Sequence, residues 1–514
     1  MSAVVPTVQA PGARAPNVLT LRRLGIDTYQ EWVLYMSVEC PLCRSEGWDA
    51  QSRIQVNLGS RSIVATLNVV TSDLLAPHEA SLSEVAWREL EAVDGHDVTL
   101  AHPPPLDSLR HVRAKLYGGR VDEAGFTAVM RDITAGRYAA IEIAAFVASC
   151  AGGRLTTAET TSLTRAMVAV GERLTWPGTP VADKHSVGGL PGNRTTLLVV
   201  PIVAAFGLTM PKTSSRAITS PAGTADAMET VAPVALDLAA MRRVVEKENG
   251  CIVWGGAVRL SPADDLIIRV ERPLDIDSDA QLVASVLSKK SAAGATHVVL
   301  DMPVGPTAKV RTAAAARSLR SLLMAVGDAV GLSLRVIESD GSQPVGRGIG
   351  PALEARDVLA VLQREPTAAA DLRAKAITLA GDVLELAGGL APGLGADAAT
   401  AILDDGRAWR KFVAICEAQG GLRLPPVARL THDVQASRSG RVVAIDNRRL
   451  ARVAKLCGAP KAPAAGLVLH APLGRVVSRG DSLFTLHAET SGELAYARAY
   501  ADANPDIIAL AEAS

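Results

Sequence analysis

Cysteine is scarce in this chain, which has six cysteines among 514 residues. So few thiols in a chain of this length exclude a small scaffold held together by disulfides. Cys40 and Cys43 form a Cys-x-x-Cys pair, but a structural zinc ion needs four ligands and no second Cys or His pair appears. We therefore expect no metal site.

The chain also lacks net charge and long apolar runs. Lys and Arg together number 53, as do Asp and Glu, so no global charge excess points to nucleic acid or to a membrane surface. The apolar run 197–208 is too short to span a bilayer, and residues 1–16 lack the apolar core of a signal peptide. These features predict a cytoplasmic protein with small-molecule partners.

The periodicity of the chain changes along its length. β-Branched residues in 62–70 predict strands, whereas Thr156 and Glu159 have capping-box spacing in a helical region. Farther on, apolar runs such as 297–300 alternate with helical stretches such as 352–363, which indicates an α/β lobe. The expected domains are a β-rich domain (1–101), a helical lobe (102–172, joined by about 272–295), an α/β phosphate-binding lobe (173–424) and an α+β domain (425–514). The Ala/Gly-rich stretch 387–399 is expected to be a loop.

Residues 183–196, which read DKHSVGGLPGNRTT, have the composition of an anion-binding loop. Three glycines within five residues let backbone NH groups approach a ligand, and a helix opening at Leu197 would add further NH groups. Lys184 and Arg194 would supply full charges. The alternative is an ordinary surface turn.

Residues 212–226, which read KTSSRAITSPAGTAD, form a second loop of this kind. Five Ser and Thr residues lie between positions 213 and 220, and Arg216 could fork onto a phosphate. Alone, this stretch is equally compatible with a capped helix start. Two such loops joined by an apolar segment predict successive turns at one edge of an α/β sheet, where ligands tend to bind.

Both loops, Lys184-His185-Ser186-x-Gly188-Gly189 and Ser-Arg-Ala-Ile-Thr-Ser at 215–220, resemble those of the thymidine phosphorylase and AMP phosphorylase family of pentosyltransferases. The likeness runs from about residue 106 to the C-terminus, and the extra N-terminal segment is similar to that of the AMP phosphorylase branch. It implies a cleft between a helical lobe and a large α/β lobe, and a homo-oligomer. Further matching signatures are WGG (254–256), PADD (262–265), ASVLSKK (284–290), DMPVG (301–305), DGSQP (340–344) and GRGIG (346–350).

The resemblance also implies roles for individual residues. His185 matches the active-site histidine of the family, and Asp277 matches the proton donor of the AMP phosphorylase branch. Thr196 is an equal alternative to Thr195, because the loop is one residue longer than in some relatives. The matching phosphate-binding positions are Lys184, Ser186, Thr195, Ser214 and Thr224.

Binding of the nucleoside or nucleotide is implied for a second set of residues. Ser285 and Lys289 match base-contacting positions; they lie four residues apart, and the less favoured alternative on spacing alone is a solvated helix face. The base-contacting arginine of thymidine phosphorylases has no clear counterpart, since Arg269 and Arg272 both fall near its position. The full set is Gly189, Ser215, Arg216, Ala217, Ile218, Thr219, Ser220, Ser285, Lys289 and Lys309.

The implied chemistry is phosphorolysis, in which phosphate attacks C1′ of the sugar while the base departs. Lys184 would position the anion, and Asp277 or His185 would protonate or hydrogen-bond the base. No metal or organic cofactor is required. Asp264 and Asp265 resemble the magnesium-binding acidic pair of anthranilate phosphoribosyltransferases, but no second acidic cluster lies near the first loop.

Three hypotheses remain open: a nucleoside or nucleotide phosphorylase, a phosphoribosyltransferase with a diphosphate donor, and a non-catalytic nucleotide-binding protein. The loop residues favour the first. The chain is rich in Arg and Ala rather than in the Lys and Glu typical of hyperthermophiles, with which the AMP-degrading branch is associated. We therefore expect thymidine as the substrate, giving thymine and 2-deoxy-α-D-ribose 1-phosphate, with AMP, giving adenine and ribose 1,5-bisphosphate, as the alternative.

Overall fold

The computed structural model describes residues 17–217, 220–258, 260–274, 276 and 278–512. The chain forms two compact units. The first contains residues 1–117 and 128–146, and the second contains residues 118–127 and 147–514.

A closed six-stranded barrel forms most of the first unit, with strand order β1-β5-β2-β4-β3-β6. In β3 the apolar residues Ile54 and Val56 are buried while their neighbours are more exposed, as expected for a strand with one face toward a core. Cys40 and Cys43, at the start of α1, belong to this core. The elements are β1 (Val18–Leu21), β2 (Val33–Ser37), α1 (Pro41–Glu46), β3 (Arg53–Leu58), β4 (Arg61–Val70), β5 (Glu79–Leu82), α2 (Glu84–Glu89) and β6 (Asp97–Ala101).

Four helices follow the barrel: α3 (Leu109–Leu116), α4 (Glu123–Thr134), α5 (Ala140–Cys150) and α6 (Thr157–Ala169). Helix α6 begins with the capping box expected from the sequence. The Thr156 hydroxyl accepts from the Glu159 backbone NH at 3.2 Å, and the Glu159 carboxylate accepts from the Thr156 backbone NH at 3.0 Å. Within the second unit, α6 packs against α11 (Asp279–Ala292).

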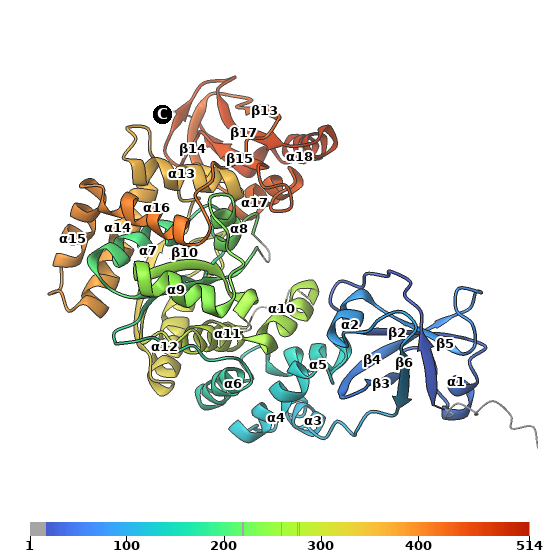
Figure 1. The fold of residues 1–514 in the computed structure, drawn as a ribbon. Coiled ribbons are helices and arrows are strands. Elements are labelled where there is room, and N and C mark those ends of the chain that lie inside the picture. Colours follow the sequence, from blue (N-terminus) through green and yellow to red (C-terminus); the bar gives the residue numbers. More distant parts are fainter. Residues whose placement is uncertain (1–16, 218–219, 259, 275, 277, 513–514) are drawn as a thin grey trace, which may run out of the picture. The chain divides into compact units, whose positions relative to one another are not determined.

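The centre of the second unit is parallel β-sheet (Figure 1). Strands β7 (Ala182–Ser186), β10 (His297–Val304) and β11 (Ser333–Asp340) form one sheet, and β8 (Met210–Ser214) pairs with β9 (Gly250–Trp254). A parallel bridge between Val181 and Thr209 links β7 to β8 at their N-terminal ends. Because β7 and β8 run in parallel side by side, the loops that follow them leave the same edge.

Helices cover both faces of this sheet. Val299 of β10 packs into a core with α7, α13, α14, α15 and α16, whereas Val298 and Leu300 pack with α11 and α12. The predicted loop at 387–399 is wrong in part, because α15 already begins at Leu394. The helices are α7 (Thr196–Phe206), α8 (Thr224–Glu229), α9 (Leu238–Glu248), η1 (Gly255–Val258), α10 (Pro262–Leu274), α12 (Ala313–Ala329), α13 (Pro351–Gln363), α14 (Ala370–Gly388), α15 (Leu394–Asp404) and α16 (Arg407–Ala418).

The C-terminal region, red in Figure 1, has two antiparallel sheets, β12-β15-β17-β13 and β16-β14-β18. Helices α17 and α18 contribute to a shared apolar core with them. Its elements are β12 (Gly348–Ile349), β13 (Leu430–Gln435), β14 (Gly440–Ile445), α17 (Asn447–Leu456), β15 (Gly466–Leu469), β16 (Val476–Val477), β17 (Ser482–Ala488), α18 (Ser491–Ala503), η2 (Pro505–Ile507) and β18 (Ile508–Ala511).

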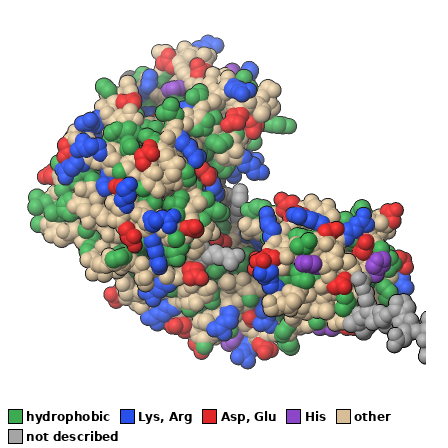
Figure 2. All heavy atoms as spheres, viewed as in Figure 1, with side chains coloured by type: hydrophobic (Ala, Val, Ile, Leu, Met, Phe, Trp, Pro, Cys, Tyr) green, Lys and Arg blue, Asp and Glu red, His purple; other side chains and the backbone are tan. Residues whose placement is uncertain are grey.

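The surface matches the balanced charge of the sequence. On the face drawn in Figure 2, Lys and Arg side chains are interspersed with Asp and Glu side chains. Among the described residues, no helix combines the length and apolarity that crossing a membrane requires.

Candidate active site

The first loop leaves β7 and turns back into α7 through residues with positive φ angles. Gly188, Gly189 and Gly192 have φ values of 94°, 83° and 70°, a region that side chains disfavour. At Gly189 a Cβ atom would lie 2.3 Å from the backbone nitrogen of Lys309. Glycine is therefore needed here for conformation and for close approach, and the loop brings Gly189 against the backbone of Lys309.

Lys184 lies in the middle of β7, just before this loop, and is almost fully buried, with 1% of its surface exposed. Its Nζ donates to Thr195 Oγ1 at 2.7 Å. Burial lowers the Lys184 pKa to about 8, although Asp301 opposes this shift. The contact places Thr195, rather than its alternative Thr196, beside the lysine.

A buried cluster of charges lies beside Lys184. Asp183 contacts Lys212 Nζ at 3.2 Å and Lys290 Nζ at 2.7 Å, and all three residues are at most 4% exposed. Burial would raise the Asp183 pKa, but the two lysines hold it below its ordinary value. One carboxylate thus faces two amines, and because burial lowers the pKa of Lys290 to about 7, the positive charge beneath the loop is largest below that pH.

The same lysines affect the protonation state of His185. Its pKa is well below the ordinary value, first because of burial and then because Lys290, Lys212, Lys289 and Lys184 all disfavour a further positive charge. A neutral imidazole cannot serve as a strong proton donor at neutral pH.

Asp301 at the C-terminal half of β10 organises the hydroxyls of the loop. It is opposite Ser186 in the strand register, and Ser186 Oγ donates to Asp301 Oδ2 at 3.0 Å. Asn193 Nδ2 and Lys375 Nζ reach the same oxygen at 3.3 and 3.1 Å, while Ser339 Oγ donates to Oδ1 at 2.6 Å. Burial alone would raise the Asp301 pKa, but Lys184 and Lys375 lower it, so the carboxylate stays ionised.

Two polar atoms at this edge of the sheet are buried without a hydrogen-bond partner among the described residues. They are Ser214 Oγ, at the end of β8, and Asn193 Oδ1, in the first loop. Buried hydroxyls and amides normally find partners. An unsatisfied hydroxyl close to a surplus of lysines is what a site for an anionic ligand requires.

The second loop differs from expectation at Arg216. Its guanidinium binds Glu229 through two contacts of 2.5 and 3.0 Å, reaches Asp226 at 3.3 Å and stacks over Trp254 at 4.9 Å. In this structure its donors face carboxylates, and the possibility that Arg216 forks onto a phosphate stays a prediction. Asp226 also accepts from the backbone NH groups of Ala217 and Gly223 at 2.6 and 2.8 Å.

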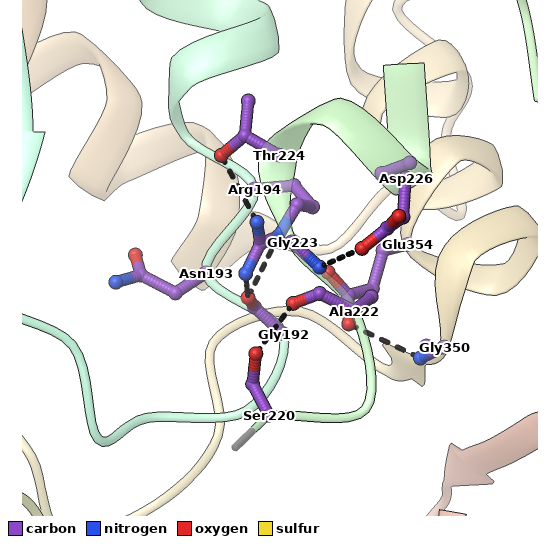
Figure 3. Close-up of polar contacts among 12 residues, drawn as sticks. Gly192, Asn193, Arg194, Ser220, Ala222, Gly223, Thr224, Asp226, Gly350 and Glu354 are labelled. Carbon is purple, nitrogen blue, oxygen red and sulfur yellow. Dashed lines mark hydrogen bonds and ion pairs between the residues drawn. The ribbon is translucent and has the colours of Figure 1, made fainter. Parts of the chain in front are cut away.

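Arg194 is likewise engaged rather than free, contrary to the expectation that it adds a full charge to the site. It forms a buried ion pair with Glu354 of α13 and donates to Thr224 Oγ1 at 3.0 Å and to the Gly192 carbonyl (Figure 3). Burial raises the Glu354 pKa to about 7 despite the adjacent guanidinium. Arg194 therefore connects the two loops.

Ser285 and Lys289 lie on one face of α11, as their spacing predicted, and Lys289 Nζ contacts Ser285 Oγ at 3.4 Å. Lys289 also pairs with the buried Asp264 of α10 at 2.5 Å. This pairing occupies Asp264, one of the two carboxylates that the magnesium hypothesis needed. The described residues include no group of three or more His, Cys, Asp or Glu side chains that could hold a metal ion.

Some predicted residues lie outside the described part of the chain: Ile218, Thr219 and the expected donor Asp277. Ser215 is exposed, and Ser220 Oγ bonds to the Ala222 carbonyl at 2.9 Å. Of the two candidate base-contacting arginines, Arg269 has a buried Nη1 atom with no hydrogen-bond partner among the described residues.

Four residues that organise the loops were missed by sequence reasoning: Lys290, Asp301, Glu354 and Lys375. Lys290 and Asp301 lie inside quoted motifs, so the motifs themselves were a usable signal. Glu354 and Lys375 lie on helices more than 150 residues along the chain from the first loop. No motif around either residue indicates that it reaches this loop.

Comparison with known proteins identifies the family. The glycosyl transferase family a/b domain matches residues 178–409, and the helical bundle domain of the same family matches residues 110–171. The pyrimidine nucleoside phosphorylase C-terminal domain matches residues 441–507. These matches agree with the predicted combination of a helical domain, an α/β domain and a C-terminal domain.

Relatives match over almost the whole chain. A protein of Polaromonas sp. strain JS666 named "Putative thymidine phosphorylase" is 64% identical over 97% of both chains. Relatives with the same name from Legionella pneumophila and Maricaulis maris are each 57% identical, covering 97% and 96% of this chain and 96% of their own. The chain therefore belongs to the thymidine phosphorylase-like family, and it is a pentosyltransferase of the pyrimidine nucleoside phosphorylase type.

Proposed function

We propose that this enzyme catalyses phosphorolysis of thymidine to thymine and 2-deoxy-α-D-ribose 1-phosphate. The observation that carries the proposal is the buried surplus of positive charge at the edge of the sheet, next to the unpartnered Ser214 hydroxyl. Such a site suits an inorganic dianion, which would accept from Lys184, Thr195, Ser214 and Thr224. Ser186 would join them by turning its hydroxyl hydrogen from Asp301 to the anion.

The choice of thymidine over AMP rests on where the cations lie. An AMP enzyme needs cations for the 5′-phosphate of its substrate, and Arg216 was the arginine suggested for this role, together with Lys309. The Arg216 guanidinium is instead paired with Glu229 and Asp226. Ser285 and Lys289 are hydrogen-bond donors that would suit the carbonyl oxygens of thymine once Lys289 turns from its pair with Asp264 to the base.

In the proposed mechanism, phosphate attacks C1′ from the two loops while Lys289 stabilises negative charge on the departing base. Asp277 is the proposed proton donor, since the neutral His185 is better suited to hydrogen bonding. The reaction as proposed uses no metal and no organic cofactor, and phosphate is a substrate. Turnover that survives exhaustive chelation and stops without phosphate is the expected behaviour; dependence on magnesium would favour a phosphoribosyltransferase.

The substrate is tested by comparing phosphate-dependent release of thymine from thymidine with release of adenine from AMP. We expect a preference for thymidine in kcat/KM. A preference for AMP of about a hundredfold, roughly 2.7 kcal/mol of transition-state binding, would overturn the assignment. Absence of phosphate-dependent base release across a nucleoside and nucleotide panel would favour a non-catalytic binding protein.

The donor is tested with Asp277→Asn, which keeps the size of the side chain and removes its proton. Loss of a general acid should lower kcat by about 10²-fold to 10⁴-fold with little change in ligand affinity. Normal turnover by Asp277→Asn would return the role to His185.

A further inference from the structure

Arg194 contacts both loops of the site. Its Nη2 and Nε atoms donate to the carbonyl of Gly192 in the first loop, at 3.0 and 3.1 Å. Its Nη1 donates to Thr224 Oγ1, in the second loop, at 3.0 Å. A single planar group thereby fixes the spacing of both loops.

Glu354 holds Arg194 in this position. The Arg194 and Glu354 side chains are 12% and 1% exposed, and Glu354 Oε1 also accepts from the Gly350 backbone NH at 3.1 Å. Figure 3 shows Arg194 between Glu354 on one side and Gly192 and Thr224 on the other. A buried pair of this kind contributes little net stability compared with apolar residues, so its presence calls for another role.

The direction of the Thr224 hydrogen bond indicates that role. A hydroxyl has one hydrogen to donate and lone pairs to accept. Because Arg194 can only donate, Thr224 Oγ1 must accept from it, and the hydroxyl hydrogen remains available to donate elsewhere. The same relation occurs in the first loop, where Lys184 donates to Thr195 Oγ1 at 2.7 Å.

We propose that Arg194, held by Glu354, is a positioning residue for phosphate that sets the Thr224 hydroxyl as a donor to the anion and fixes the gap between the loops. This inference rests on the proposed function, since it assigns a role within the same phosphate site. Arg194 does not contact the phosphate itself. Its contribution passes through Thr224 and Gly192.

The test measures the steady-state KM of both substrates and the Kd of inorganic phosphate by calorimetry, on the full-length enzyme. Glu354→Gln keeps the hydrogen bond to Gly350 but removes the charge that holds Arg194. We expect the KM and Kd for phosphate to rise roughly tenfold, while the KM for the nucleoside changes less than about twofold. Glu248→Gln is the matched control, because Glu248 pairs with Lys411 at 2.9 Å on α9 and α16. It should leave both substrates unaffected.

A double-mutant cycle separates positioning from a merely structural effect. Arg194→Met should weaken phosphate binding roughly tenfold in the wild-type background but less than about twofold in the Thr224→Val background. If Arg194→Met does not fold, Arg194→Met/Glu354→Gln removes both charges and takes its place in the cycle. Independent effects of Arg194 and Thr224, or equal effects on phosphate and nucleoside, would overturn the inference.

The outcome also distinguishes this inference from the proposed function. A wild-type enzyme that binds phosphate but releases no base would contradict the function, and the calorimetric cycle would still test the positioning role. A wild-type enzyme that binds phosphate while Glu354→Gln binds it equally well would contradict the positioning role alone. Absence of phosphate binding by the wild type would overturn both.

Discussion

The two loops at the edge of the sheet have similar compositions but opposite charge balances. In the first, Asp183 faces two buried lysines and Asp301 faces Lys375 beside Lys184, so amines outnumber carboxylates. In the second, Arg216 faces both Glu229 and Asp226. The lysines beneath the first loop, which include Lys212 at the start of the second, therefore outnumber their carboxylates, whereas the two loop arginines, Arg194 and Arg216, are each paired with carboxylates.

This difference shows that a cation in an anion-binding motif is informative only once its partners are known. Arg216 stabilises the shape of the second loop, and the hydroxyls of that loop remain for the ligand. The contrast predicts that substitutions in the first loop act on phosphate binding and on folding, whereas substitution of Arg216 acts weakly on both.

The largest expected effect comes from breaking the charge cluster beneath the first loop. Asp183→Asn leaves two buried amines without their carboxylate, and it should destabilise the protein by about 3–5 kcal/mol. Urea unfolding measures this change. Asp382→Asn, which breaks a more exposed pair with Arg335, should cost at most about 1 kcal/mol. Equal losses in the two variants would contradict a special role for the cluster.

The next effect concerns the lysine itself. Lys184→Ala should raise the KM for phosphate about a hundredfold, because it removes a charge-assisted hydrogen bond worth roughly 1.5–3 kcal/mol. Ser186→Ala should also raise the KM for phosphate, but by a smaller factor. Initial-rate kinetics with each substrate varied in turn provide the measurement. An equal rise in the KM for the nucleoside would remove Lys184 from the phosphate site.

The lowered pKa of Lys184 predicts that both phosphate use and stability depend on pH. The amine is protonated below its pKa of about 8 and neutral above it, so kcat/KM for phosphate should fall as pH rises through 8. For stability the sign is opposite. Between pH 8 and 10.5 the unfolded chain holds a proton that folded Lys184 has released, so this group favours folding more as pH rises. The fall in kcat/KM for phosphate near pH 8 should persist in the Ser214→Ala variant and be absent in the Lys184→Ala variant.

Much of this arrangement could be predicted from local sequence. The Thr156 capping box, strands β4 and β10, and the helical face shared by Ser285 and Lys289 follow from spacing and periodicity. The two loops also leave neighbouring parallel strands, as their order in the chain suggested.

What could not be predicted is the state of each charge. Glu354 and Lys375 reach the loops from distant helices, and neither stands out from other polar residues of an amphipathic helix. Their contacts depend on how α13 and α14 pack, which is a property of the tertiary structure. The carboxylate partners of Arg194 and Arg216 escaped prediction for the same reason, because a motif specifies a guanidinium but not the carboxylate that meets it.

The smallest expected effect comes from Arg216→Met. This variant tests both the role of Arg216 in the second loop and the choice between thymidine and AMP. The Arg216 and Glu229 side chains are 36% and 42% exposed, so loss of their ion pair should cost at most about 1 kcal/mol of stability. For a thymidine phosphorylase the KM of phosphate and of thymidine should each change less than about twofold, because Arg216 is occupied by carboxylates. In an AMP phosphorylase that used Arg216 for the 5′-phosphate, the same variant would raise the KM for AMP about tenfold or more. Arg320→Met, which removes another exposed pair with Glu338, provides the control for a general effect of charge.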